Sequence, residues 1–327
     1  MNFSYENASV KFCPQISDSI TVPYHATKAM QMVTLTAIIL NCLIWPIGFA
    51  ANVLVFITVL TKPQLRTVYN TSVLCLIATD LCVIVMAETS NIAYLLNKFI
   101  TGDYSCSVFL VYNLLMWWCH GLSFFTLLVI SIERYFAVFC PFRYEESMTK
   151  TRVFCVVVTF WMVWSAVMLI LHFRSSIPHK TRTIVVTSLV LPSIVSTLVI
   201  YCKILHETRG NIVQVSPPAL DPSAGNQARK SSKTVGLIIG VQMTSFTPSI
   251  CLNIVQALSL VPKNLLIHGI FPFAEAATFR NAVLDPLIYF WRNREARRSL
   301  KELRPRLQAK NTSVLHLTSF GKPVSGH

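Results

Sequence analysis

Long apolar runs separated by short polar stretches alternate along this chain of 327 residues. Each run is close to the roughly 20 residues that an α-helix needs to cross the hydrocarbon core of a bilayer. Seven runs can be placed, although the last contains several polar and charged residues, so that hydropathy alone would count six. They occupy residues 33–60, 70–95, 106–132, 153–171, 184–206, 234–260 and 265–289. The pattern predicts an all-α membrane protein built as a bundle of seven transmembrane helices.

Charge placement favours seven crossings over six. The chain is 53% hydrophobic and 13% charged, which is about half the charge of a typical soluble domain. Most Lys and Arg fall in alternate connections and in the tail after residue 290, as expected for segments inside the cell. Two glycosylation sequons, at Asn2 and Asn7, favour an amino terminus outside. An outside start and an inside tail require an odd number of crossings. The net charge of +14 then reflects topology and attraction to membrane lipids, and indicates no nucleic-acid partner.

These patterns divide the chain into an extracellular amino terminus (1–32), a seven-transmembrane domain (33–289), an amphipathic cytoplasmic helix (290–306) and a disordered cytoplasmic tail (307–327). The short helix is predicted because Ala296, Leu300, Leu303 and Leu307 recur at helical spacing opposite several arginines. A solvated basic tail is the alternative. No removable signal peptide is visible, so we expect the first helix to act as the insertion signal. The connection at 207–232 is rich in Pro and is expected to be mobile.

Two motifs carry a family resemblance. Glu133-Arg134-Tyr135 closes the third apolar run and is followed by Pro141-Phe-Arg-Tyr, and the seventh run contains Asp285-Pro-Leu-Ile-Tyr289. Together they resemble the rhodopsin-like (class A) G-protein-coupled receptors over nearly the whole of residues 33–304. The resemblance implies a plasma-membrane receptor that binds an extracellular ligand and activates a heterotrimeric G protein, with arrestin and a receptor kinase as further partners. It assigns G-protein coupling to Glu133, Arg134, Tyr135, Pro141 and Tyr289.

Ionisable residues inside a bilayer are costly, so each is a candidate functional residue. By the resemblance, five polar residues of four helices form a hydrated pocket that holds an allosteric sodium ion in the inactive state. They are Asn52, Asp80, Ser123, Asn281 and Asp285. Carboxylate, hydroxyl and amide oxygens suit a hard cation. A water-filled polar network without sodium is the alternative. Apart from sodium, no cofactor is expected.

The resemblance also predicts a conformational switch at Pro192, Phe246, Pro248 and Pro286, where a proline can bend its helix. The chain departs from the family here. Phe246 replaces the usual Trp, and Ala228 occupies the place of an acidic residue that often bridges to the arginine. The inactive state should therefore lack two restraints, and we expect signalling without agonist.

Seven residues are expected to face the ligand in the outer half of the bundle: Glu88, Asn91, Met116, His120, Asn253, Gln256 and Glu275. Met116 stands where amine receptors have an Asp, which argues against a biogenic-amine receptor of the usual kind. The two carboxylates favour a ligand with a basic group, such as a peptide or an amine-bearing compound, and a lipid ligand is the second candidate. His120 could equally be a core histidine, and Glu275 could pair internally with it. A brief second extracellular loop weakly resembles the melanocortin, cannabinoid and lysophospholipid receptors.

Of the ten cysteines, Cys13 and Cys106 alone are expected on the oxidising side of the membrane. The loop that supplies the family's usual disulfide partner contains no Cys. The sequence therefore predicts a Cys13–Cys106 disulfide, with free thiols or a buried Cys106 as the alternatives.

A second class of function, a seven-span transporter or channel, would predict repeated halves with broken helices at matching positions. No internal repeat is visible. No pairing of a nucleophile with a base and no metal-ligand spacing appears either, so we do not expect an enzyme.

Overall fold

A computed structural model describes residues 27–101, 105–174, 179–209, 222–257, 260–262 and 265–298. The elements in these ranges are all helical, and no strand occurs among them. In chain order they are α1 (Lys28–Thr61), the 3-10 turn η2 (Pro63–Leu65), α2 (Val68–Cys82), the π-helix η3 (Val83–Glu88), α3 (Thr89–Thr101), α4 (Cys106–Phe139), α5 (Pro141–Ser147), α6 (Lys150–Phe173), α7 (His179–Arg209), α8 (Pro222–Ala257), the π-helix η4 (Leu266–Ile270), α10 (Phe271–Phe279) and α11 (Asn281–Arg292).

Threonine side chains cap the starts of three helices. The hydroxyls of Thr27, Thr67 and Thr149 accept hydrogen bonds from the backbone N–H groups three residues further on, at 3.2–3.3 Å. The first N–H groups of a helix have no partner within the helix, so such a cap satisfies one of them. Each of the three caps therefore fixes where a long apolar helix begins.

Within the described residues, six helices are long and apolar enough to cross a membrane. One of them is the continuous segment Val68–Thr101, which joins α2, η3 and α3. The seventh predicted crossing, 265–289, is divided among η4, α10 and α11, and it does not meet the length and hydropathy of the other six. The predicted helical membrane bundle is thus confirmed with six clear spans, the number expected from hydropathy alone.

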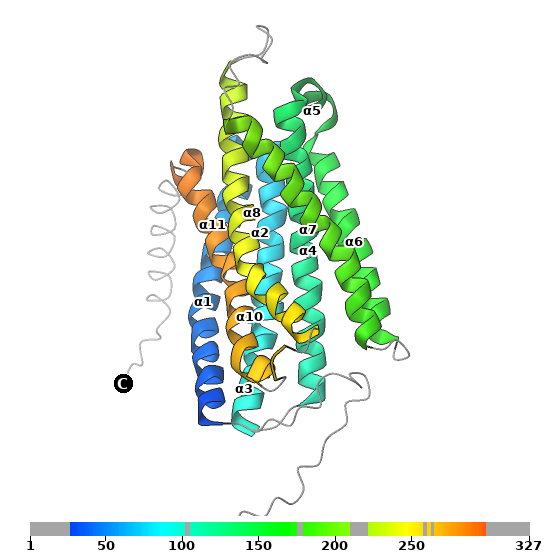
Figure 1. The fold of residues 1–327 in the computed structure, drawn as a ribbon. Helices are drawn as coiled ribbons and strands as arrows, with labels where there is room; N and C mark the ends of the chain where they lie inside the picture. Colours follow the sequence, from blue (N-terminus) through cyan, green and yellow to red (C-terminus); the bar gives the residue numbers. More distant parts are fainter. Residues whose placement is uncertain are drawn as a thin grey trace, which may run out of the picture.

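The helices lie side by side along one long axis (Figure 1). Helix α4 packs against α2, α6, α7 and α8, and α1 packs against α11. In the most apolar stretches of α4 and of Val68–Thr101, 61% of residues are buried, whereas the corresponding share is 22% in α6 and in the α7 span. These first two spans therefore form the centre of the bundle. Large apolar side chains such as Ile47, Met162 and Val199 point outward, as a lipid environment requires.

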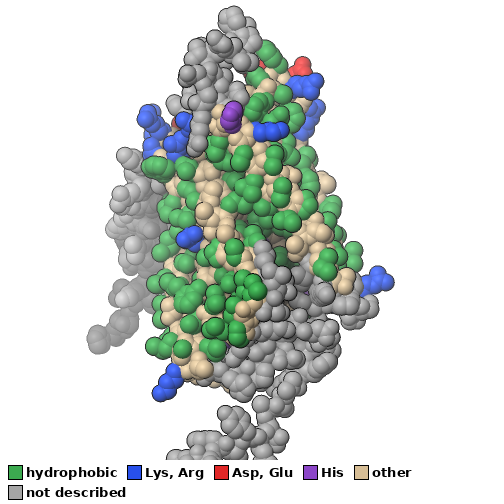
Figure 2. Space-filling view, in the orientation of Figure 1, with side chains coloured by type: hydrophobic (Ala, Val, Ile, Leu, Met, Phe, Trp, Pro, Cys, Tyr) green, Lys and Arg blue, Asp and Glu red, His purple; other side chains and the backbone are tan. Residues whose placement is uncertain are grey.

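Positive charge gathers towards one end of the bundle. On the face shown in Figure 2, most Lys and Arg side chains gather at the end of the bundle that carries α5, and apolar side chains dominate the band below. We call the α5 end the inner end and the opposite end the outer end, in line with the predicted topology.

Some predicted boundaries differ from the structure. Helix α1 begins at Lys28, before the predicted boundary at residue 33. Helix α8 begins at Pro222, so the later part of the predicted connection 207–232 is helical. Residues 294–298 are helical, and Asn293 caps them by accepting from the Ala296 N–H at 3.0 Å. The remainder of the predicted helix 290–306 lies outside the described residues, as do Asn2, Asn7, Cys13 and the tail 307–327. These assignments stay predictions.

Three tryptophans fix α4 against α6. The indole N–H groups of Trp118, Trp161 and Trp164 donate to Ser165, Thr126 and the Trp118 carbonyl at 2.8–2.9 Å. Trp164 also lies directly over Gly121, where an added Cβ would be 2.2 Å from its ring atoms. The absence of a side chain at Gly121 is what allows these two helices to approach so closely.

Candidate functional site

The inner end of α4 carries a buried ion pair. Arg134 is 3% exposed and Glu133 is 1% exposed, and the guanidinium donates to the neighbouring carboxylate. The Tyr144 hydroxyl donates to the same carboxylate at 2.9 Å and accepts from Arg134 at 3.2 Å. Ser72 donates to the second carboxylate oxygen at 2.7 Å. Donors from α2, α4 and α5 therefore converge on Glu133, and this arrangement offsets the cost of burying its charge.

Two aromatic rings enclose the Arg134 guanidinium. Its central carbon lies 4.8 Å from the centre of the Tyr69 ring and 5.9 Å from that of Tyr144, within the range of cation–π attraction. Tyr69 in turn shares a side-chain hydrogen bond with Thr234 of α8. Burial and the adjacent Glu133 charge raise the pKa of Tyr144 to about 12. Tyr144 is therefore neutral at physiological pH and available as a donor.

The other coupling residues lie around this cluster. Tyr135 stacks on Phe139 with ring centres 4.6 Å apart, and Pro141 begins α5. Tyr289 is fully buried, and its hydroxyl donates to Asn70 at 3.1 Å. This bond ties α11 to the start of α2. Tyr289 thus joins a cluster beside the ion pair, against which Tyr69 also packs.

The central polar residues are all buried, between 0% and 5% exposed. Asn52 donates to the carbonyls of Gly48 at 2.8 Å and Ala282 at 2.5 Å, which links α1 to α11. The carboxyl groups of Asp80 and Asp285 are close enough to interact electrostatically. Side-chain oxygens of all five residues lack a hydrogen-bond partner within the described part of the chain: Asn52, Asp80, Ser123, Asn281 and Asp285. Two neighbouring buried carboxyl groups with orphaned oxygens are ligands of the kind that a hard cation prefers.

The switch residues lie within their helices. Pro192 is inside α7, Pro248 inside α8 and Pro286 inside α11. Phe246 is buried against Phe124, with ring centres 4.7 Å apart, and meets the His120 ring edge-on at 5.1 Å. Phe246 therefore occupies an aromatic contact between α8 and α4. The side chain at Ala228 lies outside the described part.

The described residues expected in the outer half of the bundle differ in their surroundings. His120 is buried between Phe246 and Phe279, and its Nδ1 lies 2.8 Å from the Met116 carbonyl oxygen, which supports the core reading. Met116 packs against two apolar clusters. Both polar groups of Glu88 and of Asn91 are buried without a hydrogen-bond partner in the described residues. The side chains of Asn253 and Gln256 lie outside that part.

Glu275 has partners other than His120, which the sequence raised as an alternative. Its carboxyl group shares a hydrogen bond with Tyr112 and lies near the Lys98 ammonium group. The alternative pairing of Glu275 with His120 is therefore wrong. Lys98 lies beyond the predicted apolar run 70–95, but the structure places it in α3, where it is 2% exposed. Asn41, fully buried in α1 with both polar atoms unpartnered among described residues, was also missed. The position of Asn41, a polar residue within an apolar run, could have identified it from the sequence.

Cys106 opens α4 and is disulfide-bonded, whereas the other cysteines of the described ranges are free. Its predicted partner, Cys13, lies outside the described residues, so the Cys13–Cys106 pairing stays a prediction.

Comparison with known proteins gives one family match. Residues 51–184 match the family described as 7 transmembrane receptor (rhodopsin family). That stretch runs from α1 to the start of α7 and includes the buried ion pair.

Several relatives are named as receptors. A protein of Amphibalanus amphitrite, "Probable G-protein coupled receptor No18", is 33% identical over 40% of this chain and 34% of its own length. The octopamine receptor beta-1R of Drosophila melanogaster is 24% identical over 88% of this chain and 65% of its own. The 5-hydroxytryptamine receptor 6 of Mus musculus is 22% identical over 81% of this chain and 69% of its own. The matched regions thus cover from about a third to about two thirds of these relatives.

Proposed function

Because this chain belongs to the rhodopsin-like (class A) family of seven-transmembrane receptors, we propose that it binds an extracellular ligand and activates a heterotrimeric G protein. The observation that carries the proposal is the buried Glu133–Arg134 pair at the inner end of α4. A guanidinium released from such a pair can hydrogen-bond carbonyl groups on a partner helix. The family consists of receptors and not enzymes, and a transporter or channel is not favoured.

The mechanism requires α8 to move away from the inner end of α4. Hydrogen bonds connect α8 to its neighbours, among them Tyr69 with Thr234, Arg280 with Ser245 at 3.1 Å, and Ser249 with the Ala274 carbonyl at 3.3 Å. Ligand binding in the outer half would favour the state in which the innermost of these bonds is broken. Arg134 would then be exposed to the G protein, because the helix that closes this end has moved.

We place the protein in the plasma membrane with its amino terminus outside and its tail inside. Membrane lipids surround the apolar band, and the basic segment after α11 would lie on the inner leaflet. Arrestin and a receptor kinase complete the expected set of partners, which includes no nucleic acid.

For the ligand, we propose a molecule with a basic group. Glu88 and Glu275 place two carboxyl groups in the outer half, and the named relatives include octopamine and 5-hydroxytryptamine receptors. Since Met116 replaces the usual Asp, the basic group would be recognised at these carboxyl groups. A screen of peptides, amines and lipids with a promiscuous G-protein readout would identify the ligand.

We also propose that sodium binds at Asp80, Asp285 and their three polar neighbours in the inactive state. A cation there would neutralise two buried carboxyl groups that otherwise carry their desolvation cost unaided. Only this chain's own residues are needed to form the set of oxygen ligands.

The test of G-protein coupling uses purified receptor incubated with a promiscuous G protein and apyrase, which removes nucleotide. Wild-type receptor should retain the G protein, and Arg134→Ala should lose retention while surface expression is unchanged. Arg66→Ala removes an exposed positive charge at the same end, away from α4, and should leave retention intact. Full retention by Arg134→Ala would refute the proposed role.

A further inference from the structure

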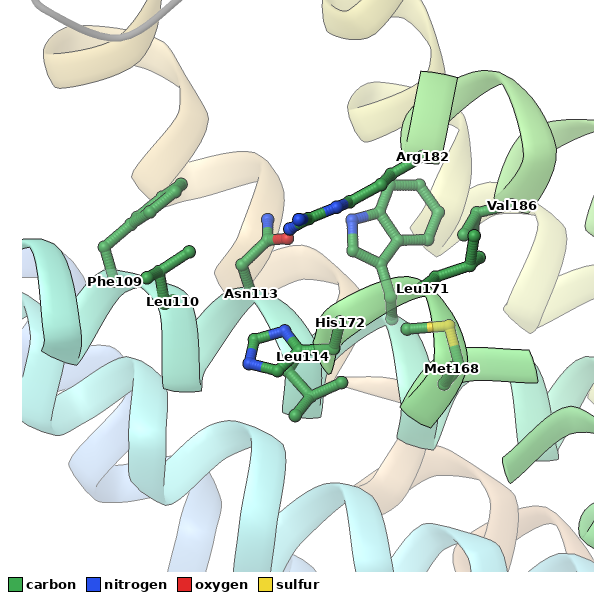
Figure 3. A pocket seen from close by; sticks show the side chains of 10 residues that line it. Phe109, Leu110, Asn113, Leu114, Met168, Leu171, His172, Arg182 and Val186 are labelled. Carbon is green, nitrogen blue, oxygen red and sulfur yellow. The ribbon is translucent and has the colours of Figure 1, made fainter. Parts of the chain in front are cut away.

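A cavity lies at the outer ends of α4, α6 and α7 (Figure 3). Three polar side chains line it, one from each helix: Asn113, His172 and Arg182. In Figure 3, Arg182 reaches from α7 towards Asn113, and His172 points into the same space. None of these residues belongs to the coupling site, the central polar pocket or the predicted ligand site.

Arg182 brings a positive charge to the cavity, and only some of the donors of its guanidinium have a hydrogen-bond acceptor within the described part of the chain. One terminal nitrogen donates to the Arg174 carbonyl at 3.3 Å, whereas the buried Nε has no hydrogen-bond partner among the described residues. Partial burial lowers the pKa of Arg182, but a guanidinium remains protonated at physiological pH. None of the described residues that line the cavity is acidic. An anion is therefore the complement that this guanidinium lacks.

The rest of the cavity wall is apolar. Leu110, Leu114 and Trp117 recur at helical spacing along one face of α4, and Met168 and Val186 face them from α6 and α7. Such a wall favours contact with hydrocarbon over contact with water. The cavity thus combines a cationic rim with an apolar wall.

We propose that this cavity binds an anionic amphiphile, a carboxylate or phosphate group attached to a single hydrocarbon chain. The headgroup accepts hydrogen bonds from Arg182 and from the Asn113 amide, and His172 lies close enough to Arg182 to add a further donor. The chain lies along Leu110, Leu114 and Trp117. This site differs in charge from the Glu88 and Glu275 region, so the two regions select ligands of opposite sign.

The test measures equilibrium binding of radiolabelled oleate to purified receptor in nanodiscs of neutral phosphatidylcholine. Saturable binding to the wild type is expected, with competition by oleoyl lysophosphatidate but not by oleyl alcohol or acetate. Arg182→Gln should weaken oleate binding about tenfold or more, because it removes the charged donor. Arg174→Gln removes an exposed positive charge beside the cavity without removing a lining side chain, and should bind oleate as the wild type does.

Thermal unfolding of each variant shows whether it is folded, and Asn113→Leu supplies a second variant that should also weaken binding. Equal oleate affinity in the wild type and Arg182→Gln would overturn the proposal. Competition by oleyl alcohol as strong as that by unlabelled oleate would overturn it as well. The assay contains no G protein, so its outcome is independent of the proposed signalling activity.

Discussion

Individual side chains stabilise the buried charges at the inner end of the bundle by hydrogen bonding. Glu133 is held by Arg134, Tyr144 and Ser72, which come from three different helices. Hydrogen bonds to a charged group are worth about 1.5–3 kcal/mol each, roughly twice the value for neutral pairs. Loss of one donor should therefore be measurable in the free energy of unfolding of the ligand-free receptor.

Tyr144→Phe tests this directly. The variant keeps the ring that lies over Arg134 but loses the hydroxyl that donates to Glu133. We expect a lower Tm for the ligand-free protein and greater retention of nucleotide-free G protein, since the locked state is weakened. Tyr135→Phe is the control for Tm, because the Tyr135 hydroxyl makes no hydrogen bond within the described part of the chain. An unchanged Tm for Tyr144→Phe would show that the bond contributes nothing.

The sodium proposal also concerns a few side chains. Purified receptor should have a higher Tm in sodium chloride than in N-methylglucamine chloride, because a ligand that binds the folded state alone stabilises it. Asp80→Asn should abolish that difference. Glu88→Gln removes another buried carboxyl group outside the pocket and should preserve it. Equal Tm of the wild type in both salts would show a polar pocket without sodium.

At the scale of elements, apolar periodicity predicted where the helices lie but not their irregularities. The π-helix η3 falls within the predicted run 70–95, and one extra residue in a helical turn does not change the hydropathy of the run. Its free carbonyl at Ile84 is satisfied by Trp45 at 3.0 Å and Thr89 at 3.2 Å. The bond from Trp45 depends on how α1 packs against η3, and no local sequence pattern predicts that packing. The seventh crossing is weak in hydropathy because it contains functional candidates such as Glu275 and Asp285.

The packing of α4 on α6 gives a prediction about glycine. Gly121→Ala would place a methyl group within 2.2 Å of Trp164, so the helices must separate. We expect a loss of about 1–3 kcal/mol in stability, as for other overpacked cores, with a lower Tm in thermal unfolding. Gly240→Ala is the matched control, since nothing lies within 4 Å of its added Cβ. That variant should be neutral or stabilised by up to about 1 kcal/mol. Equal Tm values for the two variants would contradict the packing argument.

At the scale of the whole molecule, contacts between neighbours in the sequence could be predicted, whereas contacts between residues far apart in the sequence could not. The Glu133–Arg134 pair is adjacent in sequence and could be predicted from the family resemblance. Ser72 lies 61 residues from Glu133, and Tyr144 lies 11 residues away beyond a turn, so neither contact follows from spacing alone. The central polar residues were predicted as a set, and all five are buried. The pairing of Glu275 with His120 failed because it rested on charge alone, without the position of Lys98.

The same global packing bears on signalling without agonist, which the missing Trp at position 246 and Ala228 led us to expect. The structure supplies one restraint that the sequence did not reveal, the bond between Tyr69 of α2 and Thr234 at the inner end of α8. Thr234→Val removes it while keeping the side-chain volume. A neutral hydrogen bond is worth about 0.5–1.5 kcal/mol, so agonist-free signalling should rise roughly 2- to 12-fold at matched surface expression. Thr244→Val is the control, because Thr244 is exposed and bonds only to the Val241 carbonyl of its own helix. Equal basal signalling by the wild type and Thr234→Val would show that this bond does not hold α8 in place.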